Sequence, residues 1–513
     1  METVKVDAGS IFSSTQWLIL GTLLTITVFI GRHIWKMRHF IEKASRLPGI
    51  KGVGFFGIAL ELLLCPAEDT FTKISVYFEK NFGLCKFWLG NKFIVAVNDP
   101  NYLEKLISNK DCWEKDNVYD ILKPYVGEGL ITAPAEKWKK NRRLLNPSFK
   151  QKILNGFVPV FCKHSNILMD ILEKGEDDPD FNINEKLMAA TLDTTCDAVM
   201  GVPVDAQTSS SSFGVWLDSY MEFCSLRLTR FIYRSDFIFY LVHGTVFSNV
   251  LANIESFSKT VFERQKQIFN QEMSAMKEGT HSVEEEKRNP TFLKLLLEVS
   301  YHGGLLSDQE IQEEINTFIA AATDTSASAL SYCCLLLAMH PEYQQRVYEE
   351  AVGILGKERD VTFSDIPEFQ FLDMCLKETL RLFPVIPFVV RITSADIELD
   401  NYIIPEGTSL LYCIFATHRS PKNWKDPLKF NPYRFSPEES AKMHPYSYMP
   451  FMKGPRTCIG QKYSFMVMKV MLTKAIRRFQ FNTEYRSVEE VELKLNLAIR
   501  PKHGFKLTLK RRV

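Results

Sequence analysis

The longest stretch of the chain without a charged residue lies near its N-terminus. Residues 8–31 contain no Asp, Glu, Lys or Arg, and their apolar centre runs from Trp17 to Ile30. A helix of this length extends about 36 Å, which is enough to cross a hydrocarbon core of about 30 Å. Trp17 and Trp35 lie near its two ends, where a membrane interface favours indole rings. The pattern predicts a membrane-spanning helix, and we expect it to be the single anchor of the chain.

The charges on either side of this apolar run predict its orientation. Residues 32–51 carry six Lys or Arg side chains and one Glu, whereas the upstream flank has only Glu2, Lys5 and Asp7. The positive-inside rule therefore places the body of the protein in the cytosol. A cleaved secretory signal peptide is the alternative, but its positive charge would precede the apolar run. We predict a lumenal tail and anchor over 1–31, a basic flank and hinge over 32–50, and a catalytic domain over 51–513.

The rest of the chain shows mainly the hydrophobic periodicity of helices. Ser307 and Glu310 form a capping box, and the helix that begins there is predicted to run about 32 residues, to about His340, where Pro341 ends it. A buried helix of that length would span the whole body, which favours one large domain. A helix is also expected after Gly460, and an amphipathic basic helix around Trp138.

Two other stretches have a different pattern. Residues 399–412 alternate like strands around a turn at 405–407. Residues 271–289 are polar and lack apolar anchors, so we expect an exposed loop there. The predicted fold class is mainly α: a single large helical domain with a small β-rich region and an N-terminal transmembrane helix.

Composition narrows the class of protein. Of the 513 residues, 46% are hydrophobic and 24% are charged, which excludes a disordered, collagen-like or multi-span membrane protein. The net charge of +1 gives no electrostatic attraction for nucleic acid, so no nucleic-acid partner is expected. The eleven cysteines include no C-x-x-C pair, which argues against a zinc ribbon or a dithiol redox site. Scattered reduced thiols fit the cytosolic side of a membrane.

One cysteine differs from the others in its neighbours. Cys458 lies between Gly454 and Gly460, with Arg456 two residues before it and a helix expected from about Gln461. Glycines permit a tight backbone turn around the sulfur, and a helix N-terminus stabilises a thiolate. These features suit a thiolate that binds iron. On spacing alone, a lone cysteine between glycines is more often structural.

The segment around this cysteine resembles a known family. Its pattern F-x-x-G-x-R-x-C-x-G matches the haem-binding signature of the cytochrome P450 superfamily at every fixed position, through Phe451, Gly454, Arg456, Cys458 and Gly460. The resemblance implies a single P450-type helical domain. It also implies that Cys458 is the axial ligand of the iron in haem b.

A second motif supports the resemblance. Glu378 and Arg381 in E-T-L-R share a helix face, and Arg434 follows in F-N-P-Y-R-F. By the resemblance, these three residues form a buried ion network that supports the haem loop. A solvated helix pair is the alternative for so short a motif. Tyr433 occupies a position where the family often has Glu.

Cationic residues match the family's contacts to the haem propionates. Trp138 and Arg142 form W-x-x-x-R on the basic helix, and Arg391 and Arg456 match two further contacts. Arginine suits a carboxylate because its planar donors can bind both oxygens. The other cations of the basic helix are expected nearer a reductase docking face: Lys139, Lys140 and Arg143.

The long helix carries the residues expected to handle oxygen. Asp324 and Thr325 match the family's acid–alcohol pair, which is thought to deliver protons to dioxygen. Ala322 replaces the usual glycine of this helix. The general layout is similar to that of the fatty-acid ω-hydroxylase clan, especially its insect members. Ala321 occupies the position where many of those enzymes have a Glu that can esterify the haem, so we expect non-covalent haem.

The resemblance implies a monooxygenase of the endoplasmic reticulum membrane that acts on a lipophilic substrate such as a fatty acid, terpenoid, steroid or xenobiotic. The resemblance also implies that electrons from NADPH arrive through a partner, NADPH-cytochrome P450 reductase; no P-loop is present in the chain. Cytochrome b5 is a further candidate partner. The aromatic-rich stretch 213–240 is expected near the substrate entrance. Candidate pocket residues, all apolar, are Val126, Leu130, Ile319, Ala320, Val385, Ile386 and Phe388.

Two alternative functions remain open from the sequence. A haem-thiolate isomerase or dehydratase would need no reductase, and the intact Asp324–Thr325 pair argues against it. A non-enzymatic haem-binding sensor would not need the proton relay, so Thr325→Ala would leave its function unchanged. Oxygen incorporation that depends on NADPH and reductase discriminates the monooxygenase from the isomerase or dehydratase.

Overall fold

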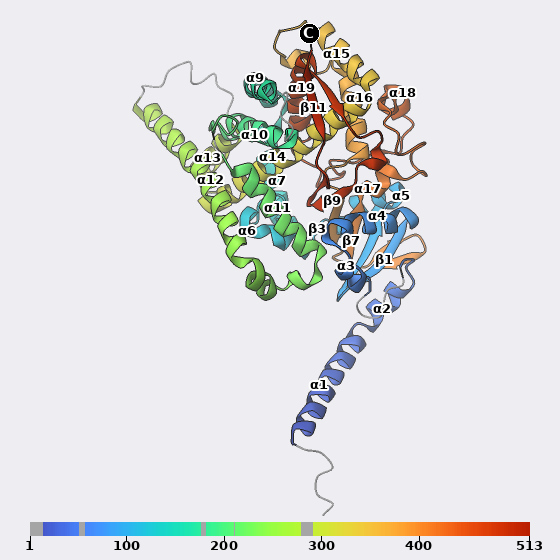
Figure 1. Cartoon of the computed structure of the whole chain (residues 1–513). Coiled ribbons are helices and arrows are strands. Elements are labelled where there is room, and N and C mark those ends of the chain that lie inside the picture. The colour runs from blue at the N-terminus through green and yellow to red at the C-terminus, as the bar shows by residue number, and fades with distance from the viewer. Residues whose placement is uncertain (1–13, 51–56, 176–180, 210, 279–290, 513) are drawn as a thin grey trace, which may run out of the picture.

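The structure is a computed structural model of the chain and describes residues 14–50, 57–175, 181–209, 211–278 and 291–512. Figure 1 shows a helical body with a small sheet at one side and α1 projecting away from it. The α-helices are α1 (Ser14–Lys36), α2 (Arg38–Ser45), α3 (Ala59–Leu64), α4 (Thr70–Lys80), α5 (Pro100–Ser108), α6 (Lys123–Val126), α7 (Ala135–Leu145), α8 (Gln151–Asn155), α9 (Val158–Lys174), α10 (Ile183–Thr195), α11 (Phe213–Thr229), α12 (Asp236–Glu278), α13 (Phe292–Gly303), α14 (Asp308–Met339), α15 (Pro341–Leu355), α16 (Gln370–Leu382), α17 (Ile414–Arg419), α18 (Pro437–Ser440) and α19 (Gln461–Arg478). The strands are β1 (Leu84–Leu89), β2 (Lys92–Val97), β3 (Glu114–Lys115), β4 (Phe388–Ile392), β5 (Ile397–Leu399), β6 (Tyr402–Ile404), β7 (Ser409–Cys413), β8 (Phe479–Thr483), β9 (Leu493–Asn496), β10 (Ala498–Pro501) and β11 (Leu507–Arg511).

The central helix of the body is α14, and its bounds agree with the prediction. The Ser307 hydroxyl accepts from the Glu310 N–H at 3.2 Å, and the Glu310 carboxylate accepts from the Ser307 N–H at 2.9 Å. The helix has 32 residues and ends at Met339, before Pro341 begins α15. Most of its side chains from Ile311 onward are buried, and it packs against α10, α12 and α16. This burial around most of the helix stabilises the single domain predicted from its length.

The larger sheet has five strands in the order β1-β2-β7-β4-β3, in which only β2 and β7 are parallel. Strand β2 is buried on both faces because Val95 and Val97 belong to one apolar cluster, while Ile94 and Ala96 belong to another. The strand-like stretch predicted over 399–412 includes β6 and most of β7. The two strands are separated by a turn at Gly407, which has a positive φ of 78°.

The prediction of an exposed loop over 271–289 is wrong for the first part of that range. Helix α12 continues to Glu278, and residues 279–290 lie outside the described part. The extra turns pack beside α13, where Lys294 forms an ion pair with Glu272 at 2.6 Å and the Lys277 ammonium lies over the Tyr301 ring. Contacts between two helices thus extend a segment whose own apolar pattern is too weak to predict a helix.

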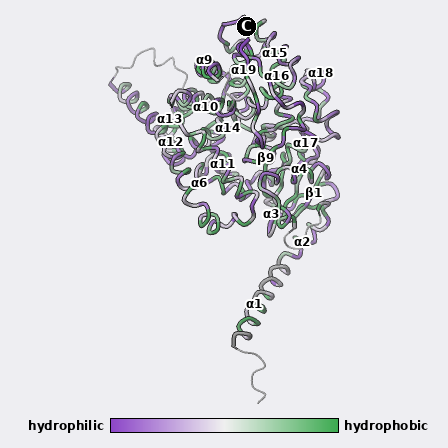
Figure 2. Tube along the Cα trace, viewed as in Figure 1, coloured by the Kyte–Doolittle hydropathy of each residue, from purple (hydrophilic) through white to green (hydrophobic). Residues whose placement is uncertain are grey.

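Helix α1 projects from the body and exposes apolar side chains along its length. Leu18, Leu23, Leu24 and Val28 are each more than half exposed. In Figure 2 hydrophobic residues occur along α1, whereas hydrophobic and hydrophilic positions alternate along most helices of the body. The helix runs past Gly31 to Lys36, and α2 follows within the basic flank. At 23 residues it extends about 35 Å, the length that a membrane anchor needs.

A second helix has the length and composition of a membrane span. Among the described residues, α12 meets this criterion, because 237–254 contain no Asp, Glu, Lys or Arg. This uncharged run has 18 residues, against 24 over 8–31. Helix α12 packs against α11 and α14, and Phe239, Phe247 and Ile254 on its inner face are buried. It is a helix of the body with one apolar outer face near its start.

Candidate active site

A cavity of about 540 Å³ lies between α14 and the loop that contains Cys458. Its wall is mostly apolar and includes residues of β4, the segment from Lys115 to Ile131, and the β9–β10 hairpin. The predicted pocket residues that line it are Val126, Leu130, Ala320, Val385, Ile386 and Phe388. From the aromatic-rich stretch, the lining residues are Tyr220, Met221, Leu228, Thr229 and Arg234.

Ile319 does not line the cavity, so its placement in the pocket is wrong. Thr317, Ala320, Ala321 and Asp324 lie one turn apart on the face of α14 that borders the cavity. Ile319 lies on another face of the helix and is fully buried in the main hydrophobic core. The residue type fits a pocket, but the helical period places the side chain elsewhere.

Cys458 differs from the other ten cysteines in its exposure. It is exposed and lines the cavity, whereas nine others are buried and Cys65 is intermediate. The Cys458 N–H donates to the Phe451 carbonyl at 2.9 Å, which closes the loop. Although the sulfur is accessible from the cavity, the surrounding protein separates it from bulk water, and this desolvation raises the pKa of the Cys458 thiol. The N–H groups of Gly460 and Gln461 and the Arg142 guanidinium lower that pKa. The turn predicted around the sulfur is present.

The two glycines of the loop serve different purposes. Gly454 has a φ of 71°, and a Cβ there would lie 2.7 Å from the Ile107 side chain, so both conformation and space require glycine. Gly460 has an ordinary φ of −84° and precedes α19. A Cβ at Gly460 would lie 3.8 Å from the Cys458 sulfur, in ordinary contact.

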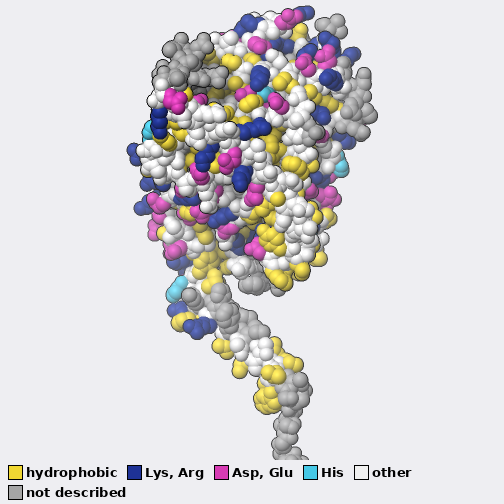
Figure 3. Space-filling model, turned by 90° about the vertical axis from the view of Figure 1, so that its left-hand side faces the viewer, with side chains coloured by type: hydrophobic (Ala, Val, Ile, Leu, Met, Phe, Trp, Pro, Cys, Tyr) yellow, Lys and Arg dark blue, Asp and Glu magenta, His cyan; other side chains and the backbone are white. Residues whose placement is uncertain are grey.

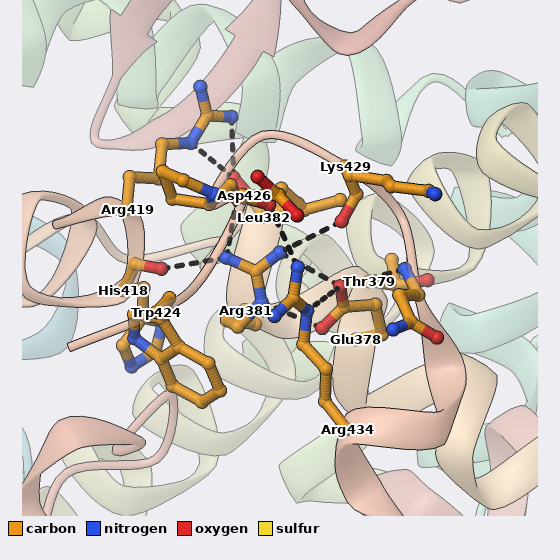
Figure 4. A network of polar contacts seen from close by, with 12 residues as sticks. Glu378, Thr379, Arg381, Leu382, His418, Arg419, Trp424, Asp426, Lys429 and Arg434 are labelled. Carbon is orange, nitrogen blue, oxygen red and sulfur yellow. Dashed lines mark hydrogen bonds and ion pairs between the residues drawn. The ribbon is translucent and has the colours of Figure 1, made fainter. Parts of the chain in front are cut away.

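Glu378, Arg381 and Arg434 meet in the buried network drawn in Figure 4. The Arg381 guanidinium binds both oxygens of Glu378, at 2.7 and 2.8 Å, and Arg434 reaches the same carboxylate at 3.3 Å. Glu378 and Arg381 are fully buried, which removes the alternative of a solvated helix pair. Arg381 also donates to the carbonyls of His418 and Pro427, so that one side chain joins three segments.

His418 connects this network to the cysteine loop, and no local sequence pattern predicts this role. Its carbonyl accepts from Arg381, and its ring Nε2 accepts from the Met449 N–H at 2.9 Å. Burial and the nearby Arg381 charge lower the pKa of His418 to about 3, which keeps the ring neutral and able to accept. Met449 lies two residues before Phe451. The ion network therefore supports the start of the cysteine loop through a histidine.

The four predicted propionate contacts all line the cavity: Trp138, Arg142, Arg391 and Arg456. The Arg456 guanidinium lies 4.6 Å above the Trp138 ring and donates to the Ala133 carbonyl at 3.1 Å. Arg142 donates to the Thr457 carbonyl at 2.8 Å, which ties α7 to the cysteine loop. Burial and the charge of Arg391 lower the pKa of Arg456 to about 10.

Lys115 adds a cation that sequence reasoning missed. It pairs with Arg391 across β3 and β4, and its ammonium lines the cavity 4.0 Å from the Tyr119 ring centre. Burial, followed by the charges of Arg391 and Arg456, lowers the pKa of Lys115 well below its usual value. Like charges opposite each other on two strands are destabilising unless an anion neutralises them. No local pattern marks this lysine, because β3 is only two residues long.

A family model described as Cytochrome P450 matches residues 47–509. The chain belongs to this family. It is therefore a cytochrome P450 monooxygenase, and the family membership predicted from the sequence is confirmed. Similar relatives include Cytochrome P450 4c3 of Drosophila melanogaster, which is 30% identical over 97% of this chain and 95% of its own length. Cytochrome P450 4V2 of Rattus norvegicus is 32% identical over 98% of this chain and 96% of its own length.

The residues of this cytochrome P450 fit the haem that its family carries. The Nε and Nη2 atoms of Arg456 are buried, and within the described part of the chain they have no hydrogen-bond partner. Together with Lys115 and Arg391 they leave a cluster of cations in one wall, which the two propionates of haem would neutralise. The thiol of Cys458 is accessible in the same cavity.

Lys115→Met is expected to weaken haem retention. Loss of one charge-assisted contact worth about 1.5–3 kcal/mol corresponds to roughly a 10- to 150-fold increase in the haem dissociation constant. The apoprotein should be no less stable, because the substitution also removes a like charge beside Arg391. Haem transfer to excess apomyoglobin measures the first effect and urea unfolding the second. The exposed Lys110 provides the control variant Lys110→Met; transfer from Lys115→Met at the parent rate would exclude this role.

Glu314 on α14 forms a buried junction behind the cavity wall. Its carboxylate accepts from the Leu130 N–H at 3.1 Å and from the Asn141 amide at 2.9 Å, so it joins the cavity wall to α7. Burial raises the pKa of Glu314 to about 7, although these two donors lower it. The carboxyl is thus protonated in the folded protein at a pH at which it is ionised in the unfolded chain.

Stability is expected to fall between pH 4.5 and pH 7 through this one group. Because the folded pKa is raised, the contribution of Glu314 is present below its unfolded pKa and is lost as the pH rises to about 7, by about 3 kcal/mol in total. Unfolding in urea at pH 5 and pH 8 should show this loss for the parent and not for Glu314→Gln. Glu313→Gln, beside it on α14, is the control and should retain the loss. Equal pH dependence in the parent and Glu314→Gln would contradict the assignment.

Proposed function

We propose that this cytochrome P450 inserts one oxygen atom of O2 into a lipophilic substrate, with electrons from NADPH delivered by NADPH-cytochrome P450 reductase. The balanced reaction is RH + O2 + NADPH + H⁺ → ROH + H2O + NADP⁺. The observation that carries the proposal is the position of Cys458, an accessible thiol in the wall of an apolar cavity that α14 also borders. An apolar cavity of this kind favours a greasy substrate held with few polar contacts.

The haem would be held by the cysteine loop and the cationic wall. Cys458 would bind its iron, and Lys115, Arg391 and Arg456 would bind its propionates, with Trp138 stacked on Arg456. When bound, haem supplies the iron at which dioxygen is activated. Ala321 lines the cavity with a methyl group, so no carboxyl is available there to esterify the haem. We therefore propose non-covalent haem b.

Asp324 and Thr325 would move protons on the face of α14 opposite Cys458. Both side chains line the cavity. The Thr325 hydroxyl donates to the Ala321 carbonyl at 2.6 Å, and this hydrogen bond fixes the position of the hydroxyl oxygen. The lone pairs of that oxygen can then accept a hydrogen bond from a proton donor in the cavity. Helix α14 remains continuous through Ala322, the position where the family usually has glycine.

The lipophilic substrate class is supported by the same apolar wall. A fatty acid, terpenoid, steroid or xenobiotic would each meet the apolar side chains of Val126, Leu130 and Phe388. A screen by the spin shift that a bound substrate induces would rank these four classes directly.

The reductase would dock near α7. Lys139, Lys140 and Arg143 are exposed on this helix, while Trp138 on its inner face contacts Arg456. The basic helix therefore lies directly over the proposed haem edge. Charge reversal at these three residues should slow electron delivery while haem remains bound; loss of haem would show that they are structural. Cytochrome b5 can be added to the same assay as a second donor.

The protein would be anchored in the endoplasmic reticulum membrane by α1, with residues 51–513 in the cytosol. An exposed apolar patch, here called the anchor-side patch, supports this placement: Leu60, Leu63, Leu64, Ile232, Phe237, Leu241, Val242 and Val246. Arg230 donates to the carbonyls of Leu62 and Leu63, which joins the end of α11 to α3. Figure 3 shows hydrophobic side chains gathered on the part of the body nearest α1. Vesicle flotation of the chain with and without residues 1–36 tests the anchor: the full chain should float with the vesicles, and the shortened chain should not. Flotation of both forms would contradict α1 as the main attachment to the membrane.

The deciding experiment is reconstitution with reductase under ¹⁸O2. The proposal predicts one ¹⁸O atom in the product and strict dependence on NADPH. Conversion without NADPH or O2 would instead identify an isomerase or dehydratase. Haem binding without turnover of any substrate class, unaffected by Thr325→Ala, would identify a sensor.

A further inference from the structure

The carboxylate of Asp324 is paired with an arginine from the opposite end of the sequence. Arg500 on β10 forms an ion pair with Asp324 Oδ1 on α14, and both side chains are buried, with 9% and 7% of their surface exposed. The same guanidinium donates to the Ser328 hydroxyl, which in turn donates to the Asp324 carbonyl at 2.6 Å. Arg500 is thereby attached to one turn of α14: it binds the Asp324 and Ser328 side chains directly and the Asp324 backbone carbonyl through Ser328.

This pairing separates the two members of the acid–alcohol pair. Thr325 donates to the Ala321 carbonyl, while Asp324 turns Oδ1 toward Arg500. Burial lowers the pKa of Arg500, but the charges of Asp324 and Asp218 outweigh it and raise the pKa overall. An unpaired carboxylate buried at this position would be strongly disfavoured. Arg500 therefore supplies the opposite charge for Asp324 in the cavity wall.

The strand that carries Arg500 also contributes to the substrate cavity. Leu495, Leu497 and Ala498 of the β9–β10 hairpin line the cavity. Between them, the Asn496 amide donates to Asp218 on α11 at 3.0 Å. The hairpin thus contacts the cavity with its apolar side chains and α14 with its arginine.

We propose that Arg500 is a positioning residue for the proton-relay acid: through its ion pair it holds the Asp324 side chain in one orientation in the cavity wall, so that the relay and one wall of the substrate cavity form a single unit. The inference rests on the proposed monooxygenase function. It assigns a role to an arginine that lies 42 residues beyond Cys458 and outside every motif found in the sequence.

The activity test follows the fate of electrons. A coupled cycle converts one NADPH into one ROH and one water, whereas an uncoupled cycle follows NADPH + H⁺ + O2 → NADP⁺ + H2O2. With reductase and lauric acid as the probe, Arg500→Met should retain the haem-thiolate spectrum and raise the fraction of NADPH recovered as H2O2 at least threefold. Arg500→Lys, which keeps a charge, should recover at least half of the coupling. Parent-like coupling in Arg500→Met would overturn the proposal.

Two further variants separate positioning from support of the fold. Lys502→Met is the matched control, because it removes the nearby ion pairs with Asp69 and Glu492 while Lys502 does not line the cavity, and its coupling should be unchanged. Should Arg500→Met lose haem, the double variant Asp324→Asn/Arg500→Met leaves neither charge unpaired. That variant should fold and remain uncoupled, and parent-like coupling in it would likewise overturn the proposal.

Hydrogen exchange tests the same link without any turnover. In the haem-loaded protein, Asp324→Asn should raise amide exchange over 493–501, because the hairpin loses its attachment to α14, while Thr325→Ala should not. Unchanged exchange in Asp324→Asn would overturn the proposal. If no substrate is oxygenated by the parent, the proposed monooxygenase function fails, and the exchange result still decides whether Arg500 holds Asp324.

Discussion

Glu378→Gln is expected to lower the free energy of unfolding by about 3–5 kcal/mol, the cost of breaking a fully buried ion pair from one side. The substitution removes the negative charge between Arg381 and Arg434, and its NH2 group faces a guanidinium donor where a carboxylate oxygen accepted. It also disturbs the carbonyls of His418 and Pro427, which Arg381 binds. Urea unfolding of the solubilised protein, followed by tryptophan fluorescence, measures the change.

The control for this variant lies one residue away on the same helix. Lys377 pairs with Asp373 at the surface, so Lys377→Gln should change stability by less than about 1 kcal/mol. Because His418 links the network to Met449, the Glu378 variant should also release haem faster than the control. A Glu378→Gln protein as stable as Lys377→Gln would show that the network does not support the cysteine loop.

Cys458→Ser is expected to abolish oxygenation while leaving the fold intact. A hydroxyl does not replace the thiolate that favours O–O cleavage, and even changes to groups around a metal ligand typically cost about 10- to 100-fold in affinity or activity. We therefore expect product formation to fall by more than about 100-fold. Product formation per NADPH with reductase measures this effect, and thermal unfolding checks that the folded state is retained.

Cys65→Ser provides the matched control, since Cys65 is the other cysteine that is not buried. Its activity should equal that of the parent. Oxygenation by Cys458→Ser at more than a tenth of the parent rate would remove Cys458 from its proposed role.

The motif residues could be predicted from the sequence because each belongs to a short local pattern. The loop around Cys458 and the helix with Glu378 and Arg381 each follow from a few neighbouring residues. Helix α14 followed from a capping box at Ser307 and a proline at 341. Such patterns depend on backbone geometry within one or two turns, and for this reason the structure contains the local features that they predict.

The partners of those motifs could not be predicted in the same way. Lys115 becomes part of the cationic wall only because β3 pairs with β4. His418 and Arg500 reach the site from 37 and 176 residues away from the groups they serve, Arg381 and Asp324. The prediction that Ile319 lines the pocket was wrong for the opposite reason. Its residue type suits a pocket, but the helical period places its side chain in the core. Long-range pairing is decided by the packed fold, and no local signal records it.

The central claim is that Cys458 supplies a thiolate to the iron of haem in the cavity bordered by α14. The absorption spectrum of the reduced, carbon-monoxide-bound protein tests it most directly. For the folded, haem-loaded parent the claim predicts a strongly red-shifted Soret band, and for Cys458→Ser it predicts that this band is lost although haem is retained. A parent spectrum without the red-shifted band, or a Cys458→Ser spectrum that keeps it, would contradict the claim.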